Sequence, residues 1–203
     1  MKKPAEPKPT PRRRDAAATR AAILASARRA FAQSGYDVAG VREIAAGAGV
    51  TAMLVNRYFG SKEQLFAEVV EQTMTTGSAI AGGIMDAPDP GRALAEALVK
   101  MTRADAAPLD GFLISFHSAS SPKAAAVGRD KIEAHHLRTV TRSLRGAHAR
   151  ERAALILAMI SGFQVMRQMI GLSALTKTRE ADLVELLSGV FDRLIAPNKA
   201  SAP

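Results

Sequence analysis

Apolar residues recur at helical spacing in the first third of the chain. Ile23, Ala27, Ala30 and Phe31 follow one another at i, i+4, i+7 and i+8, which predicts an amphipathic helix over residues 19–34. Gly35 stands where a left-handed cap would end that helix. The next apolar positions predict two shorter helices, the first starting at residue 41 and the second covering 52–58; these positions are Val41, Ile44, Ala45, Val55 and Phe59.

A glycine turn separates the two short helices. Ala48-Gly49-Val50 interrupts the first of them, and Gly49 can supply the positive φ that a sharp turn needs. Thr51 is a good N-cap for the second, because its hydroxyl can accept a free backbone N–H. Two helices joined in this way form a helix-turn-helix unit, whose second helix is shaped to enter the major groove of DNA.

Capping signals divide the rest of the chain into further helices. Ser61-Lys62-Glu63-Gln64 forms a capping box, and Asp89-Pro90 and Ser121-Pro122 each combine an N-cap residue with proline at the first helical position. No alternating strand pattern and no internal repeat is found. The chain is therefore predicted to be all-α with about nine helices, the later ones covering residues 62 to about 84, 89 to about 107, 109–119, 121 to about 145, 149–170 and 179–195.

The segment from Thr19 to Phe66 resembles the DNA-binding domain of TetR-type bacterial transcriptional regulators. The matching pieces, in the right order and spacing, are Ile23, Ala30-Phe31, Gly35-Tyr36, Val41-Arg42-Glu43-Ile44-Ala45, Ala48-Gly49-Val50-Thr51, Tyr58-Phe59-Gly60-Ser61-Lys62-Glu63 and Leu65-Phe66. The resemblance implies a three-helix head followed by a larger helical domain for ligand binding and dimerisation. It also implies DNA contacts from Arg42, Thr51, Ala52, Met53, Leu54, Asn56, Arg57, Tyr58 and Lys62.

The chemistry of these residues suits the implied role. Arg42, Tyr58, Lys62 and Thr51 can bind phosphates, which fixes the register of the protein on the duplex. Asn56 can pair with adenine, Arg57 can pair with guanine, and Met53 and Leu54 can pack on thymine methyl groups. In place of the tyrosine usual in the family the recognition helix has Asn56, so Arg57 or Tyr58 can instead be directed at phosphate. For Phe59 a place in the core of the head is favoured over a DNA contact.

Charge is concentrated at the N-terminus. Of a net charge of +9, residues 1–14 contribute six basic side chains against one acidic side chain. Residues 1–18 are predicted to form a basic, proline-rich, disordered arm that contacts DNA phosphates, the alternative being a solubilising tail. The domains expected after it are a helix-turn-helix head over 19–66, a regulatory and dimerisation domain over 67–197, and a disordered tail over 198–203.

Composition narrows the function classes. Apolar residues make up 47% of the chain, enough for a core, and cysteine is absent, so disulfides and thiolate metal sites are excluded. His135 and His136 are adjacent and splay apart on a helix, and Glu133 with His136 gives only two metal ligands. No cofactor, metal site or enzymatic activity is predicted. No signal peptide or membrane span is recognised, and a cytoplasmic protein is expected.

The helical body is expected to carry two functions of the family. The last two long helices are implied to form the homodimer interface, with Leu155, Leu183, Leu187 and Phe191 as candidates, although intramolecular core packing is the alternative for Leu183, Leu187 and Phe191. A pocket for a small apolar or amphipathic effector would be lined by Met101, Phe112, Phe116, His117, Met159, Phe163 and Met166. For each of these residues singly, ordinary core packing is the more common role.

Together these observations favour a ligand-released repressor that binds a palindromic site on double-stranded DNA as a homodimer. An architectural DNA-binding protein with a filled core is the first alternative. A helical enzyme that also binds nucleic acid is the second. A continuous apolar cavity among the middle helices would favour the repressor over both alternatives.

Overall fold

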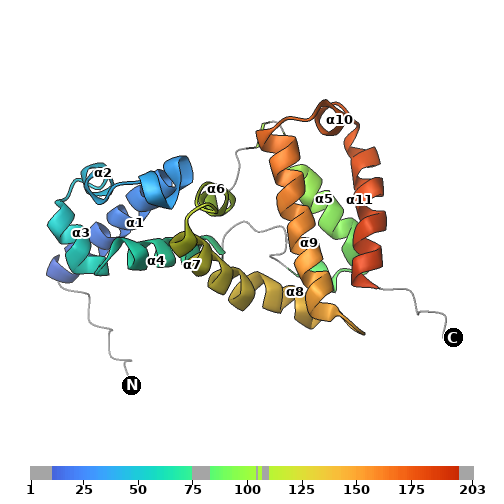
Figure 1. The fold of residues 1–203 in the computed structure, drawn as a ribbon, viewed down its shortest axis with the longest axis horizontal. Coiled ribbons are helices and arrows are strands. Elements are labelled where there is room, and N and C mark those ends of the chain that lie inside the picture. Colours follow the sequence, from blue (N-terminus) through green and yellow to red (C-terminus); the bar gives the residue numbers. More distant parts are fainter. Residues whose placement is uncertain (1–10, 75–82, 104, 107–109, 197–203) are drawn as a thin grey trace, which may run out of the picture.

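The computed structural model describes residues 11–74, 83–103, 105–106 and 110–196, and within these residues every regular element is helical. The all-α prediction is therefore confirmed. Figure 1 shows the helix-turn-helix head on one side, the body on the other, and α6 and α7 between them. No helix of the described residues combines the length and the apolar character needed to cross a membrane.

The head consists of four helices, and the starts of the third and the fourth follow the predicted signals. Gly49 takes a positive φ of 68° in the turn, and the Thr51 hydroxyl accepts a hydrogen bond from the Leu54 N–H at 3.3 Å. The Ser61 hydroxyl likewise accepts the Gln64 N–H at 3.1 Å and caps the fourth helix. The helices are α1 (Pro11–Val38), α2 (Val41–Gly47), α3 (Ala52–Phe59) and α4 (Lys62–Met74).

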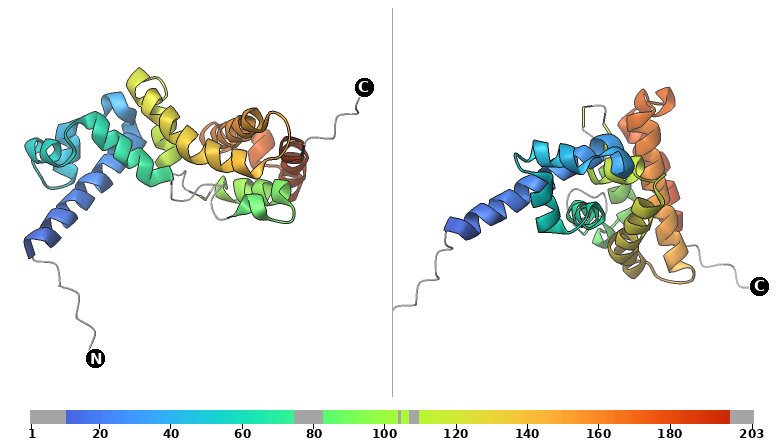
Figure 2. Two further views of the ribbon diagram at one scale, coloured as in Figure 1. Left: turned by 90° about the horizontal axis from the view of Figure 1, so that it is seen from below. Right: turned by 60° about the vertical axis from the view of Figure 1, so that its left-hand side comes forward.

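The prediction that residues 1–18 form a disordered arm is wrong for its second half. Residues 11–18 belong to α1, while residues 1–10 lie outside the described part. Pro11 occupies the first helical position, where its missing N–H removes no helical hydrogen bond, and Ala16-Ala17-Ala18 strongly favours helix. α1 thus extends beyond the other helices of the head, as the side view in Figure 2 shows.

The fourth helix does not run to Ile84 as predicted. α4 ends at Met74 among the described residues, and Ile84 belongs to a separate 3₁₀ turn, η1 (Ile84–Asp86), which follows Gly83 in a left-handed conformation with φ of 76°. Residues 75–82 lie outside the described part. α5 (Pro90–Met101) begins as predicted, with the Asp89 carboxylate accepting the Arg92 N–H at 3.0 Å, but it ends before residue 107.

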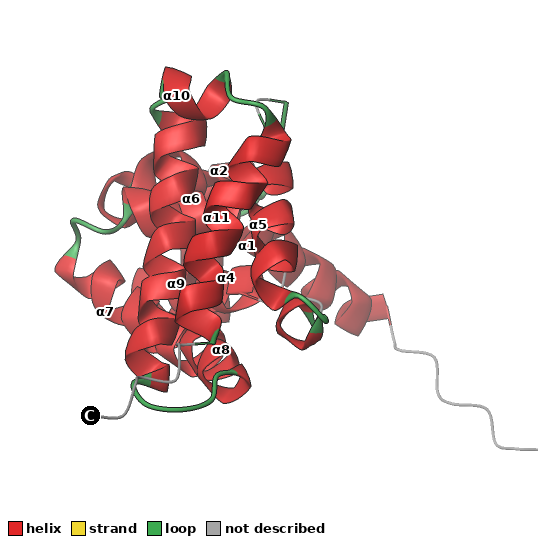
Figure 3. Cartoon of the chain, turned by 90° about the vertical axis from the view of Figure 1, so that its right-hand side faces the viewer, coloured by secondary structure: helices red, strands yellow, loops and turns green. Residues whose placement is uncertain are grey.

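The body continues through α6 (Asp110–His117), then α7 (Pro122–Ile132), the π-helical turn η2 (Glu133–Leu137) and α8 (Arg138–Ser143), which together form one unbroken helical segment. α9 (Ala149–Gln164) continues into a second π-helical turn, η3 (Val165–Met169). The short α10 (Ser173–Thr176) was not predicted, whereas α11 (Glu180–Ile195) was. In Figure 3, α9 and α11 run side by side.

Buried side chains form two separate cores. The first joins α1–α4 with Ile114 of α6 and Ala124 of α7, and at its centre Phe66 packs edge-on against Phe31 and Tyr36, each with ring centroids 5.0 Å apart. The second joins α5, α8, α9 and α11, and it contains the fully buried Phe191. The first core thus includes parts of α6 and α7, beyond the predicted head.

Candidate DNA-binding surface

The third helix presents a polar face to solvent and an apolar face to the head. Val55 and Phe59, one turn apart, are buried in the first core, as predicted. Met53, Asn56 and Arg57 lie at i, i+3 and i+4 and are all exposed, Met53 to 80%. The helix therefore shows one continuous face of a methionine, an amide and a guanidinium, a combination that can contact thymine methyl groups, adenine and guanine.

The polar side chains of this face are not paired with other side chains or backbone groups in the described part of the chain. Among the described residues, neither Asn56 nor Arg57 forms a side-chain hydrogen bond or ion pair, and the same is true of Arg42 in the first turn of α2. Arg42 is exposed close to the N-terminus of its helix, where free backbone N–H groups also favour an anion. These groups keep their full hydrogen-bonding capacity for a ligand.

The remaining predicted contacts on α3 are more enclosed. Ala52, Leu54 and Tyr58 are half-buried, and the Tyr58 ring lies against Phe59 with centroids 6.4 Å apart. Thr51 is exposed, and its hydroxyl caps α3. Tyr58 therefore packs against the head and remains partly exposed, so its placement is compatible with the phosphate contact that the resemblance implies for it.

Lys62, the first residue of α4, is held in a defined place. Its ammonium lies over the Tyr36 ring, 4.7 Å from the centroid, and donates a hydrogen bond to the Asp37 carbonyl oxygen at 3.4 Å. Burial is the largest cause raising the pKa of Tyr36, with the charges of Glu63 and Asp37 adding to it, so the ring remains a neutral phenol beneath the cation. Sequence reasoning named Lys62 but missed the two residues that hold it.

Other arginines of the head are engaged with neighbouring helices. Arg20 stacks over the Phe59 ring at 4.9 Å and pairs with Glu68 at 2.5 Å. Arg28 pairs with Asp110 of α6 at 2.7 Å. A cleft of about 360 Å³ lies beside this pair, lined by Ala21, Leu24, Ala25, Arg28, Arg29, Gln72 and Asp110, none of which belongs to the predicted effector pocket.

The predicted pocket residues fall into two groups. Phe112 and Phe116 stack on α6 with ring centroids 6.1 Å apart, while the His117 ring nitrogen Nδ1 lies 2.7 Å from the Ala32 carbonyl oxygen of α1. The second group lies on α5, α9 and η3. Its members Met101, Met159 and Phe163 are half-buried against the second core, and Met166 is exposed.

The predicted dimer residues differ in exposure. Leu183 and Phe191 are buried and Leu187 is half-buried in the second core, so these side chains pack within the chain. Leu155 on α9 is 53% exposed. On α11 the outward-facing apolar residues are Leu186 and Val190, which the prediction did not include among its interface candidates, although the amphipathic pattern of the helix contained both.

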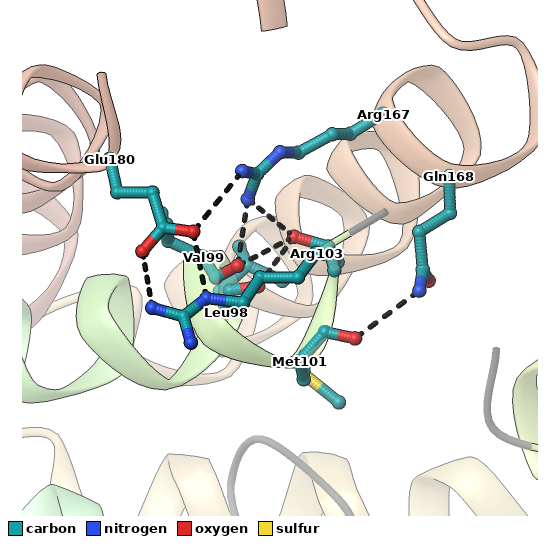
Figure 4. A network of polar contacts seen from close by, with 8 residues as sticks. Leu98, Val99, Met101, Arg103, Arg167, Gln168 and Glu180 are labelled. Atoms are coloured by element: carbon teal, nitrogen blue, oxygen red, sulfur yellow. Dashed lines mark hydrogen bonds and ion pairs between the residues drawn. The ribbon is translucent and has the colours of Figure 1, made fainter. Parts of the chain in front are cut away.

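A polar network closes the end of α5, as Figure 4 shows. Arg167 of η3 donates to the Val99 carbonyl at 2.7 Å and to the Thr102 hydroxyl at 3.0 Å, while Gln168 donates to the Met101 carbonyl at 3.2 Å. These donors satisfy carbonyl groups that the helix end leaves free, which stabilises the end of α5 at Met101. Burial lowers the pKa of the Arg167 guanidinium, and the carboxylate of Glu180 partly offsets that effect.

The histidine pair of η2 serves packing and ion pairing. The His135 ring nitrogen Nε2 lies 2.9 Å from a carboxylate oxygen of Glu71 on α4, and Glu133 accepts a hydrogen bond from Arg150 at 3.0 Å. Burial is the main cause lowering the pKa of His136, followed by the charge of His135. Within the described residues no three histidine, aspartate or glutamate side chains are grouped to hold a metal ion.

Two family models match the chain. Residues 23–69 match the model described as bacterial regulatory proteins, tetR family. Residues 89–195, more than half of the chain, match the model described as the tetracyclin repressor-like C-terminal domain. Among curated proteins, none matches this sequence.

Solved structures share the arrangement of helices. A transcriptional regulator from Pseudomonas aeruginosa PAO1 superposes with a TM-score of 0.66 at 21% identity, covering 94% of this chain and 94% of that chain. One from Rhodococcus sp. Rha1 has a TM-score of 0.64 at 24% identity, covering 86% and 96%. The regulator FadR from Bacillus subtilis, solved in complex with stearoyl-CoA, has a TM-score of 0.61 at 16% identity, covering 87% and 97%.

Proposed function

Because the chain belongs to the TetR family of bacterial regulatory proteins and is therefore a transcriptional regulator, we propose that it represses transcription as a homodimer bound to a palindromic operator. We further propose that a small effector releases it from DNA. The observation that carries the proposal is the exposed face of α3, on which Met53, Asn56 and Arg57 have no polar side-chain partner in the part of the chain that the structure describes.

In the proposed complex, α3 lies in the major groove and its neighbours hold the phosphate backbone. Asn56 reads adenine and Arg57 reads guanine, while Met53 and Leu54 contact thymine methyl groups. The contacts to phosphates, which set the register on the duplex, come from Arg42, Thr51, Ala52 through its backbone N–H, Tyr58 and Lys62.

Two recognition helices are needed because one covers few base pairs. A twofold dimer places its two copies about one DNA turn apart, and a palindromic site matches that symmetry. We place the dimer interface on the outward faces of α9 and α11, where Leu155, Leu186 and Val190 are exposed to 53%, 68% and 44%. After Leu155, α9 exposes the small residues Ala158 and Gly162, which allow a partner helix to approach closely.

An amphipathic effector is supported by the neighbours and by the composition of the body. The structurally similar FadR was solved with stearoyl-CoA, a molecule with a long apolar chain and an anionic head. In this chain Met101, Met159 and Phe163 are half-buried at the edge of the second core, and methionine adapts readily to apolar ligands. Effector binding would favour a body conformation in which the two heads are wrongly spaced for the operator.

Selection of bound sequences from a pool of random duplex DNA tests the proposal. The purified full-length chain should enrich a palindromic motif whose half-sites are centred about 10 base pairs apart or a multiple of that distance. Sedimentation of the protein on an enriched duplex should give two protomers per site. Failure to enrich any motif would remove the repressor function, and enrichment of a single, unrepeated half-site would remove the dimer.

A further inference from the structure

The turn between α6 and α7 is hydrogen-bonded to the end of α1 through buried serine hydroxyl groups. The Ser118 hydroxyl accepts a hydrogen bond from the Tyr36 backbone N–H at 3.0 Å, and the Ser121 hydroxyl donates to the Asp37 carboxylate at 2.9 Å. Both serines are nearly inaccessible, at 2% and 3% exposure. The contact joins segments that are more than eighty positions apart in sequence, and it holds the Tyr36 backbone and the Asp37 side chain, the two residues after Gly35.

Gly35 makes this close approach possible. Its φ is 73°, a conformation that side chains disfavour, and a Cβ placed on it would overlap the His117 carbonyl group. The α6 backbone therefore rests directly on the α1 backbone at this point, and the position requires glycine for two independent reasons. The junction is thus a direct backbone contact between α6 and the head.

Ser121 is used in an unusual way. It stands immediately before Pro122, at the N-cap position of α7, where a serine hydroxyl normally accepts a backbone N–H of its own helix. Here no such cap forms, and the hydroxyl is directed to Asp37 of the head instead. A local helix-capping interaction has therefore been exchanged for a long-range one.

Tyr36 and Asp37, which form these hydrogen bonds with the serines, are also the two residues that contact Lys62. The Tyr36 ring lies beneath the Lys62 ammonium at 4.7 Å, and the Asp37 carbonyl oxygen accepts one of its N–H donors at 3.4 Å. A lysine ammonium has three donors, so two remain for a phosphate. A side chain held in place by two partners also loses less conformational entropy when it binds than a freely rotating one does.

We propose that Ser118 and Ser121 are positioning residues for DNA binding, which act by holding Tyr36 and Asp37 so that Lys62 faces the phosphate backbone. The inference rests on the proposed function, because it takes Lys62 to be a phosphate contact. It adds a route by which the position of α6 and α7 in the body reaches the DNA-binding surface.

The test compares Ser121→Ala with Ser120→Ala, the neighbouring exposed serine of the same turn, which has no polar partner among the described residues. Affinity for a duplex enriched by the wild-type protein is measured by fluorescence anisotropy from 50 to 300 mM salt. Each lost phosphate contact lowers the slope of log K against log salt by about 0.9, so Lys62→Ala should lower it by about 1.8 per dimer. Ser121→Ala should move the slope towards that value and weaken binding by about 3- to 10-fold per protomer, as expected for a lost hydrogen bond.

Coupling between the two positions separates positioning from general destabilisation. In a Lys62→Ala background, Ser121→Ala should have no further effect on affinity, and Ser121→Thr, which keeps the hydroxyl, should restore the wild-type slope. Thermal unfolding of each variant verifies that the compared proteins are folded. Additive effects of Ser121→Ala and Lys62→Ala, or a Ser121→Ala slope equal to that of Ser120→Ala, would overturn the inference. A wild-type protein that enriches no duplex would instead refute the proposed function.

Discussion

Replacing Arg57 by alanine isolates the contribution of the recognition helix. The guanidinium is exposed on α3 and forms no hydrogen bond or ion pair with any other described residue, so the free energy of unfolding should change by less than about 0.5 kcal/mol. Alanine is also the strongest helix former, and it keeps α3 intact. Any large loss of DNA affinity in Arg57→Ala can therefore be assigned to the interface itself.

The expected size of that loss depends on what Arg57 contacts. A bidentate contact to guanine contributes about 1–3 kcal/mol of discrimination, and a dimer makes it twice, so affinity should fall by about 30-fold to about 10⁴-fold. The loss should then be confined to duplexes that carry the guanine. A contact to phosphate would instead weaken binding to all sequences alike and lower the salt slope by about 1.8 per dimer.

Anisotropy titrations on the enriched duplex and on a duplex with the guanines replaced measure both quantities. Arg29→Ala is the matched control, because it removes the same charge from an exposed position of the head that lies on α1. Arg57→Ala and Arg29→Ala should unfold at the same urea concentration. If the two variants bind the enriched duplex equally well, the reasoning that places α3 in the groove is refuted.

Three further predictions concern the body and its contact with α4. Leu186→Asp should give folded monomers in sedimentation, and a dimeric variant would place the interface elsewhere. Phe191→Ala instead leaves a cavity at a fully buried site, so it should lower the free energy of unfolding by about 3–5 kcal/mol. Arg167→Met should destabilise by about 1–3 kcal/mol in urea titrations, because it removes the buried donor to the Val99 carbonyl and to the Thr102 hydroxyl, and a change under about 0.5 kcal/mol would contradict that. On α4, the hydrogen bond from Lys131 is the main cause lowering the pKa of Glu71. The extra free energy of unfolding that Glu71 gives relative to Glu71→Gln should therefore be complete above the usual glutamate pKa of about 4.5. That stability should disappear as pH falls further, and a difference constant from pH 7 to 3 would disprove the linkage.

The parts that the sequence predicts well are governed by contacts close in the chain. Thr51, Ser61 and Asp89 cap their helices because each hydroxyl or carboxylate meets an N–H three residues later, a relation that needs no tertiary information. The same holds for Gly49, whose positive φ follows from the tight turn itself. The outward face of α3 could be predicted because Val55 and Phe59 identify the opposite face.

The parts that it misses depend on partners distant in the chain. The end of α5 is stabilised by Arg167 and Gln168, which lie more than sixty positions away and donate to its last carbonyl groups. An amphipathic pattern identifies the apolar side of α11 but cannot say which of its residues face the chain and which face a partner, so Phe191 and Leu186 were not told apart. The start of α1 at Pro11 was missed because prolines before it were taken as breakers along the whole arm.

The placement of the first core bears on how a regulator of this design can transmit a signal. The sequence motif ends near Phe66, yet the core around Phe66 continues into Ile114 of α6 and Ala124 of α7, which belong to the segment assigned to the body. A domain boundary at residue 66 therefore marks the end of the sequence motif, whereas the packed first core continues beyond it. Because close-packed cores change between discrete arrangements instead of deforming gradually, a shift of α6 has to move the helices of the head with it. If the proposed effector displaces α6, no flexible linker is needed to reach α3, since α6 already forms part of the core on which α3 rests.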